Sequence, residues 1–202
     1  TCRMIFRRKV LENDYCIQQA IDILDLVQEG DLPFDRTMKI STAEANAKEK
    51  IAARMPANIQ TVHRLLELNR DDWATLDEGG LSKTKVKEIK ARVRARRRKM
   101  ATLVEELSLR TSKVQPLLQK MRSINFKMRQ LERELAHGEE NPDVLDPEDM
   151  MVMREELNGL RGLVLEDPEE LSARVADITV VFNEYEQAKR DLSGGNLRLV
   201  VS

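Results

Sequence analysis

The sequence has very few of the residues that build disulfide frameworks, metal centres and aromatic cores. Its 202 residues include two cysteines, two histidines and one tryptophan, and aromatic residues make up 3% of the chain. Cys2 and Cys16 are too few for a disulfide framework, which is typical of a protein in the reducing cytoplasm. His63 and His137 are far apart in sequence and lack the spacing of zinc ligands. We therefore expect no metal site.

Long apolar runs and glycine-rich phosphate loops are also missing. No apolar stretch approaches the roughly 20 residues that cross a bilayer, and no signal peptide is visible. The glycine pairs at 79–80 and 194–195 do not lie between a strand and a helix, as a nucleotide-binding loop requires. The sequence thus predicts a protein that is not an enzyme, with no cofactor, no small-molecule substrate and no membrane contact.

Charged residues are abundant instead. Lys, Arg, Asp and Glu make up 34% of the chain, and the formal net charge is −1. Together with sparse glycine and proline, this composition favours long helices over a sheet. We expect an all-α fold, an elongated multi-helix bundle.

Apolar residues at helical spacing define the expected elements. The first helix is expected over 3–28, with Gly30 as its C-cap. A second is expected to start at Ser41, with Glu44 completing a capping box, and to be interrupted at Met55-Pro56. The further expected helices are one with an apolar stripe from Ile59 to Trp73, one over 82–110 capped by Ser82, one over 112–138, one over 148–165 and one over 168–192. Gly194-Gly195 is expected to separate the last helix from the terminal apolar segment.

The helices over 82–110 and 112–138 carry long apolar stripes and are joined by a short break. This arrangement predicts a long antiparallel helical hairpin. The segment 139–149 is acidic and contains two prolines, which is typical of a linker. We expect three parts: a helical region over 1–138, the acidic linker over 139–149, and a helical region over 150–202.

The strongest chemical signal is a basic segment. Residues 83–99 contain ten Lys or Arg and one acid, Glu88. The densest part consists of Arg92, Arg94, Arg96, Arg97, Arg98 and Lys99. Such density attracts phosphates by counterion release, and the scarcity of aromatic residues favours contact with the backbone over base stacking. Two interpretations stay open: this helix contacts DNA, or it is a solvated surface that pairs with the acidic linker of the same chain.

The acidic linker has two interpretations as well. It is either simply solvated, or it faces a partner and regulates the basic segment.

The C-terminal segment 186–202 reads EQAKRDLSGGNLRLVVS. It resembles the entry into the second conserved region of bacterial primary sigma factors, the promoter-reading subunits of RNA polymerase, and its Asn-Leu-Arg-Leu-Val string is the characteristic part. Residues 6–12 and 29–36 look like the sequence that follows the first conserved region in some members. Between these segments lies what the family treats as a variable helical insert. Gly194-Gly195 departs from the helix-forming residues that the family more often has there.

The resemblance implies that core RNA polymerase and promoter DNA are the partners. It also implies that Asn196 and Leu199 help to line a pocket for a base flipped out of the melted promoter, and that Leu197, Val200 and Val201 pack into a domain core. Because Thr1 is not an initiator Met and the terminal apolar run has no core of its own, we expect the chain to be part of a longer protein. The alternative is a self-contained coiled-coil adaptor or scaffold, favoured by the near-heptad stripe from Val114 to Leu135.

Overall fold

The computed structural model describes the backbone of residues 2–201 and the side chains of residues 2–196. Within this range it contains eight helices and no named strand, which confirms the expected all-α bundle. The helices are α1 (Cys2–Leu11), α2 (Asp14–Glu29), α3 (Phe34–Thr37), α4 (Ala47–Glu78), α5 (Lys83–Glu105), α6 (Thr111–Glu140), α7 (Pro147–Val164) and α8 (Pro168–Val201). No helix of the described range is long and apolar enough to cross a membrane.

The expected first helix is in fact two helices, α1 and α2. Asn13 is extended and caps α2, because its side chain accepts a hydrogen bond from the Cys16 amide at 3.2 Å. Its amide group also donates to the Val164 carbonyl at 3.3 Å and to the Glu166 carboxylate at 3.1 Å. The break therefore exists because the turn at Asn13 docks on the corner between α7 and α8.

The expected start and interruption of the next helix are both wrong. Ser41 only accepts a bond from the Ala43 amide, and α4 begins at Ala47. The helix then continues through Pro56, which is exposed. Because proline has no backbone N–H, the carbonyl four residues before it has no amide partner, and on this exposed side water can hydrate it. On the adjacent face Met55 and Ile59 are buried and hold this part of α4 on the bundle.

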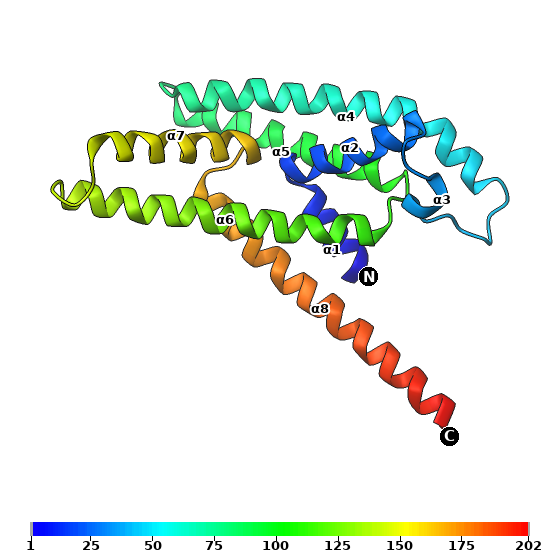
Figure 1. Cartoon of the computed structure of the whole chain (residues 1–202). Helices are drawn as coiled ribbons and strands as arrows, with labels where there is room; N and C mark the ends of the chain where they lie inside the picture. Colours follow the sequence, from blue (N-terminus) through cyan, green and yellow to red (C-terminus); the bar gives the residue numbers. More distant parts are fainter. Residues whose placement is uncertain (1, 202) are drawn as a thin grey trace.

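A long antiparallel hairpin is present, but its arms differ from the expected pair. α4 and α5 lie side by side along their length, and α6 packs along α7 (Figure 1). The turn between α4 and α5 uses Gly79 and Gly80, both with positive φ. Leu107 and Leu109 are fully buried in the connection from α5 to α6, so this connection passes through the core instead of forming an exposed tip.

The core draws on helices from both ends of the chain. The buried apolar side chains include Phe6, Val10, Ile17, Ile21, Leu24, Ile59, Val62, Leu66, Met100, Val104, Leu118, Met121, Leu171 and Ile178. Phe6 of α1 packs against Phe182 and Tyr185 of α8, with ring centroids 5.2 and 5.8 Å apart. Because α7 and the first part of α8 share this core, the segment from residue 150 onward packs in the same bundle as the segment before 138.

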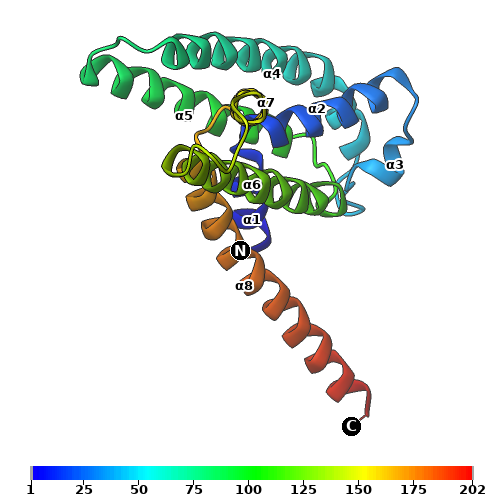
Figure 2. The same ribbon diagram turned by 60° about the vertical axis from the view of Figure 1, so that its left-hand side comes forward.

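The acidic connection over 139–149 forms the tip between α6 and α7. Asp146 caps α7 through the Glu148 amide at 2.8 Å, and Pro147 opens the helix as the sequence predicts. Pro168 likewise opens α8. The last part of α8 projects away from the bundle (Figures 1 and 2).

The sequence predicted that the last helix ends before Gly194-Gly195. This prediction is wrong, because α8 continues through both glycines.

Candidate nucleic-acid interface

The basic residues of α5 fall on three different faces of the helix. Its buried face consists of Ile89, Val93, Met100, Ala101 and Val104, which pack on the rest of the bundle. Because each residue turns the helix by about 100°, successive Lys and Arg residues of α5 point in different directions around its axis. The structure therefore divides the predicted patch into groups with different surroundings.

Arg92 and Arg96 face α4 and share one carboxylate. The Arg92 Nε donates to Asp72 Oδ2 at 2.8 Å, and Arg96 pairs with the same carboxylate. Arg96 also donates to the Asn69 side chain at 3.3 Å, and its side chain is 19% exposed. The hydrogen bonds from Arg92 and then from Arg96 lower the pKa of Asp72, against the opposing effect of burial. These two arginines join the arms of the α4–α5 hairpin.

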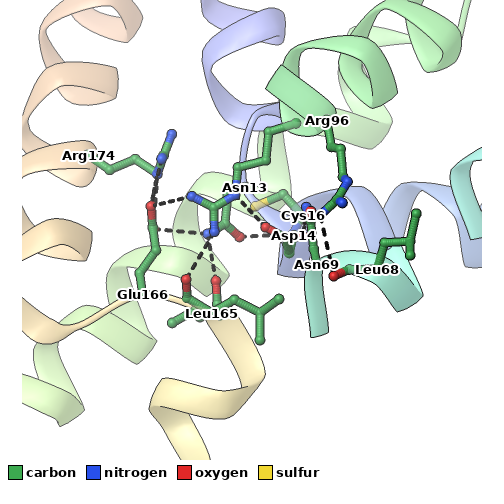
Figure 3. A network of polar contacts seen from close by, with 11 residues as sticks. Asn13, Asp14, Cys16, Leu68, Asn69, Arg96, Leu165, Glu166 and Arg174 are labelled. Atoms are coloured by element: carbon green, nitrogen blue, oxygen red, sulfur yellow. Dashed lines mark hydrogen bonds and ion pairs between the residues drawn. The ribbon is translucent and has the colours of Figure 1, made fainter. Parts of the chain in front are cut away.

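Arg97 lies inside the bundle, where its side chain is 8% exposed. Figure 3 shows its partners Asp14, Leu165 and Glu166 close together. Its guanidinium pairs with Asp14 of α2 and with Glu166, and it donates to the Leu165 carbonyl at 3.0 Å. Leu165 has a φ of 52°, an uncommon value for a residue other than glycine. Arg97 thus fixes the corner between α7 and α8.

The same network satisfies its remaining polar atoms from other helices. Arg174 of α8 donates to Glu166 at 2.8 Å, and Asn69 of α4 donates to Asp14 at 2.8 Å. Glu166 and Asp14 are 2% and 3% exposed. Since buried carboxylates are costly unless they are paired, this network is a condition of the fold. Arg97 is consequently a structural residue, contrary to its predicted place in a DNA-binding patch.

A third group of cations faces solvent. Lys83, Lys87, Arg94 and Arg98 are exposed, and no ion pair within the described residues involves them. Spacings of four, seven and four residues place them on one side of the helix, over about 22 Å. We call this set the α5 stripe. Two of its members, Arg94 and Arg98, belong to the patch that the sequence predicts.

Lys99 and Lys90 border the α5 stripe. Lys99 is exposed and has no ion-pair partner among the described residues, but it lies about 100° from Arg98 around the helix. Lys90 lies at the edge of the stripe and pairs with Glu170 of α8 at 2.5 Å. It also lines a groove of about 520 Å³ between α5 and α8, together with Arg94, Trp73 and Asp177.

The acidic connection does not neutralise α5. Within the described residues, the carboxylates paired with α5 come from α2, α4, α5 itself, the α7–α8 corner and α8. Glu139 instead pairs with Arg154 of α7 at 2.8 Å. The interpretation that α5 pairs with the acidic linker is therefore wrong, because the paired cations of α5 bind carboxylates from other parts of the bundle.

The two predicted residues of the C-terminal segment lie on the projecting end of α8. Asn196 is exposed there. The side chain of Leu199 lies outside the residues whose side chains the structure describes. Leu192, one turn before Asn196, is 71% exposed. The part of this segment whose side chains are described is therefore exposed from residue 187 to residue 196 and points away from the bundle.

The histidines lie apart. His63 contacts Asp25 at 3.0 Å, and His137 contacts Asn141 at the end of α6. Among the described residues no group of three or more His, Cys, Asp or Glu side chains is arranged to hold a metal ion.

Sequence reasoning missed the carboxylates that bind the arginines. One signal was present: Asn69 and Asp72 lie on the buried stripe of α4, where polar residues need partners. Asp14 and Glu166 carried no comparable signal, because their burial depends on how α2 and the α7–α8 corner meet.

Comparisons with known proteins give no match to a family model, to a curated protein or to a solved structure.

Proposed function

We propose that this chain is part of a bacterial sigma factor that directs RNA polymerase to promoters. In this proposal the bundle is a helical spacer, and the end of α8 leads into the promoter-reading domain. The observation that carries the proposal is the position of residues 186–196. They resemble the start of the sigma-factor helix, and all of them from residue 187 onward are exposed on the projecting part of α8 rather than buried in the bundle core.

The α5 stripe supports a contact with duplex DNA in the same proposal. Cations without a carboxylate partner can release the counterions condensed on DNA without first breaking an ion pair. A straight run of about 22 Å spans about six phosphates of one strand at 3.4 Å each. The four members of the stripe suit this spacing as backbone contacts, which carry no sequence preference. The proposed DNA surface is therefore Lys83, Lys87, Arg94 and Arg98, in place of the continuous run from Arg92.

A scaffold formed through the stripe of α6 is the second candidate function. The observation that bears on it is burial: Val114, Leu118, Met121, Met128 and Leu131 are covered within a single chain. A coiled-coil seam needs these positions on the surface of a free helix. Their burial favours the sigma-factor proposal over a scaffold.

Binding to duplex promoter DNA tests the proposed surface. We expect Lys87→Gln/Arg94→Gln/Arg98→Gln to bind more weakly at 50 mM salt. The slope of log Kobs against log salt should be shallower by about 0.9 for each phosphate that the variant no longer neutralises. The measurement is fluorescence anisotropy with duplexes of different sequence.

The matched control is Arg36→Gln/Lys39→Gln/Arg54→Gln. It removes the same charge from exposed positions near α3 and the start of α4, where the described residues form no ion pair with these side chains. An equal decrease in affinity in both triple variants, or a decrease confined to one DNA sequence, would contradict backbone contact by the α5 stripe.

In vitro transcription tests the proposal that this chain is part of a sigma factor. The complete product of the gene that encodes this chain should give promoter-specific run-off transcripts with core RNA polymerase. Residues 1–202 alone should give none, because the end of α8 would lack the promoter-reading domain into which the proposal places it. A complete gene product that forms no stable complex with core polymerase would refute the proposal.

A further inference from the structure

We propose that Glu170 of α8 occupies Lys90 in place of a DNA phosphate, so that Lys90 joins the α5 stripe when this ion pair opens. The inference rests on the proposed contact between the stripe and duplex DNA. It adds a fifth DNA-binding residue and an acidic residue that competes with the DNA for it.

Lys90 has the position that such a contact requires. It lies three residues after Lys87 and four before Arg94, so it shares the side of α5 on which these two lie. Its Nζ atom is 2.5 Å from Glu170 Oε1, and the two side chains are 38% and 42% exposed. Of the cations on this side of α5, Lys90 has a carboxylate partner, whereas Lys83, Lys87, Arg94 and Arg98 have none within the described residues.

The backbone that carries Glu170 is packed on the bundle. Glu170 belongs to the first turn of α8, and the next residue, Leu171, is fully buried. Lys9 of α1 also pairs with Asp177 two turns further along α8. Lysine has a flexible four-carbon stem that can turn toward a phosphate while the helix stays in place.

The competition is expected to be modest but measurable. Ion pairs exposed to this degree are weak, so a phosphate beside the stripe can displace Glu170. While the ion pair holds, the stripe neutralises one phosphate fewer, and the salt dependence of DNA binding is smaller. Each additional phosphate that is neutralised steepens the slope of log Kobs against log salt by about 0.9.

The test compares Glu170→Gln with Glu169→Gln in the whole chain. Both substitutions remove one negative charge from the start of α8. Glu169 is exposed and has no ion pair within the described residues. We expect Glu170→Gln to bind a duplex about two- to fivefold more tightly at 50 mM salt, with a slope steeper by up to about 0.9, depending on how often the ion pair stays closed in the unmodified complex. Glu169→Gln should keep the slope of the unmodified chain.

A double-variant cycle assigns the effect to Lys90. In a Lys90→Gln background, Glu170→Gln should bring no more gain than Glu169→Gln. If the unmodified chain binds duplex DNA with a salt-dependent affinity but Glu170→Gln behaves as Glu169→Gln does, the competition is refuted and the DNA contact stands. If the unmodified chain does not bind duplex DNA at all, both proposals are overturned.

Discussion

At the scale of the residue, neighbouring arginines of one helix have unrelated roles. Arg97 binds two buried carboxylates and the Leu165 carbonyl, whereas Arg98 faces solvent. A step of about 100° around α5 moves the side chain from the core to the surface. Charge density along a sequence therefore overestimates the number of cations that can bind DNA.

Arg97→Ala and Arg98→Ala make a matched pair. Arg97→Ala leaves Asp14 and Glu166 without their shared cation and should lower the free energy of unfolding by about 3–5 kcal/mol. Arg98→Ala should change it by less than about 0.5 kcal/mol. Urea unfolding followed by circular dichroism measures both. Similar decreases in the two variants would show that Arg97 does not have this structural role.

The lowered pKa of Asp72 predicts that its contribution to the free energy of unfolding depends on pH. Because its pKa is lowered in the folded chain, its ionised form contributes stability above the unfolded value of about 3.9. This contribution is lost as the pH falls through the folded pKa. Asp72→Asn should therefore destabilise the protein at pH 7 by about 1.5–3 kcal/mol, and the difference should shrink below about pH 4. Urea unfolding across this range measures it, and a difference independent of pH would contradict the assignment.

At the scale of the element, tertiary contacts override local signals in both directions. α1 and α2 separate where apolar spacing runs on without a break, because Asn13 binds the α7–α8 corner. α4 continues through Pro56 because Met55 and Ile59, which precede and follow it in the sequence, are buried in the bundle.

Residues 187–196 of α8 are all exposed, so no packing against the bundle supports this part of the helix. Gly194 and Gly195 have open space around them, with no atom within 4 Å of an added Cβ. Gly194→Ala/Gly195→Ala should stabilise this part of the helix by up to about 1 kcal/mol per residue. Carbon chemical shifts of residues 186–196 should become more helical. The urea midpoint of the bundle should not change, and a shifted midpoint would mean that this segment packs on the bundle.

At the scale of the whole molecule, segments from both ends of the chain meet. Phe6 of α1 stacks with Tyr185 of α8, and Lys9 pairs with Asp177. The apolar stripe of α6 is buried beneath α1, α2, α7 and α8. A single chain thus covers the surface that a coiled-coil partner would need.

The chain should accordingly sediment as a monomer. Analytical ultracentrifugation at micromolar concentrations measures this, and the mass of one chain is 23.3 kDa. A stable oligomer that dissociates when Leu118 or Leu131 is replaced by Ala would support the scaffold instead. Dissociation without a decrease in helix content is required, because both residues are also buried in the monomer.

The sequence by itself determined the all-α class, the buried stripes and several helix ends. Helical periodicity identified Ile17, Val62 and Met121 as core residues, and local capping chemistry identified Gly30 and Ser82 as caps. These features depend on residues within about one or two turns of each other, so short-range patterns contain the information.

The tertiary structure alone decided which helices pair and which cations remain free. The α4–α5 pairing depends on Asp72 meeting Arg92 and Arg96, and the burial of Arg97 depends on Asp14 and Glu166. These partners are between 20 and 83 residues apart in the sequence. Their contacts are set by how the helices pack, which no local pattern of charge specifies.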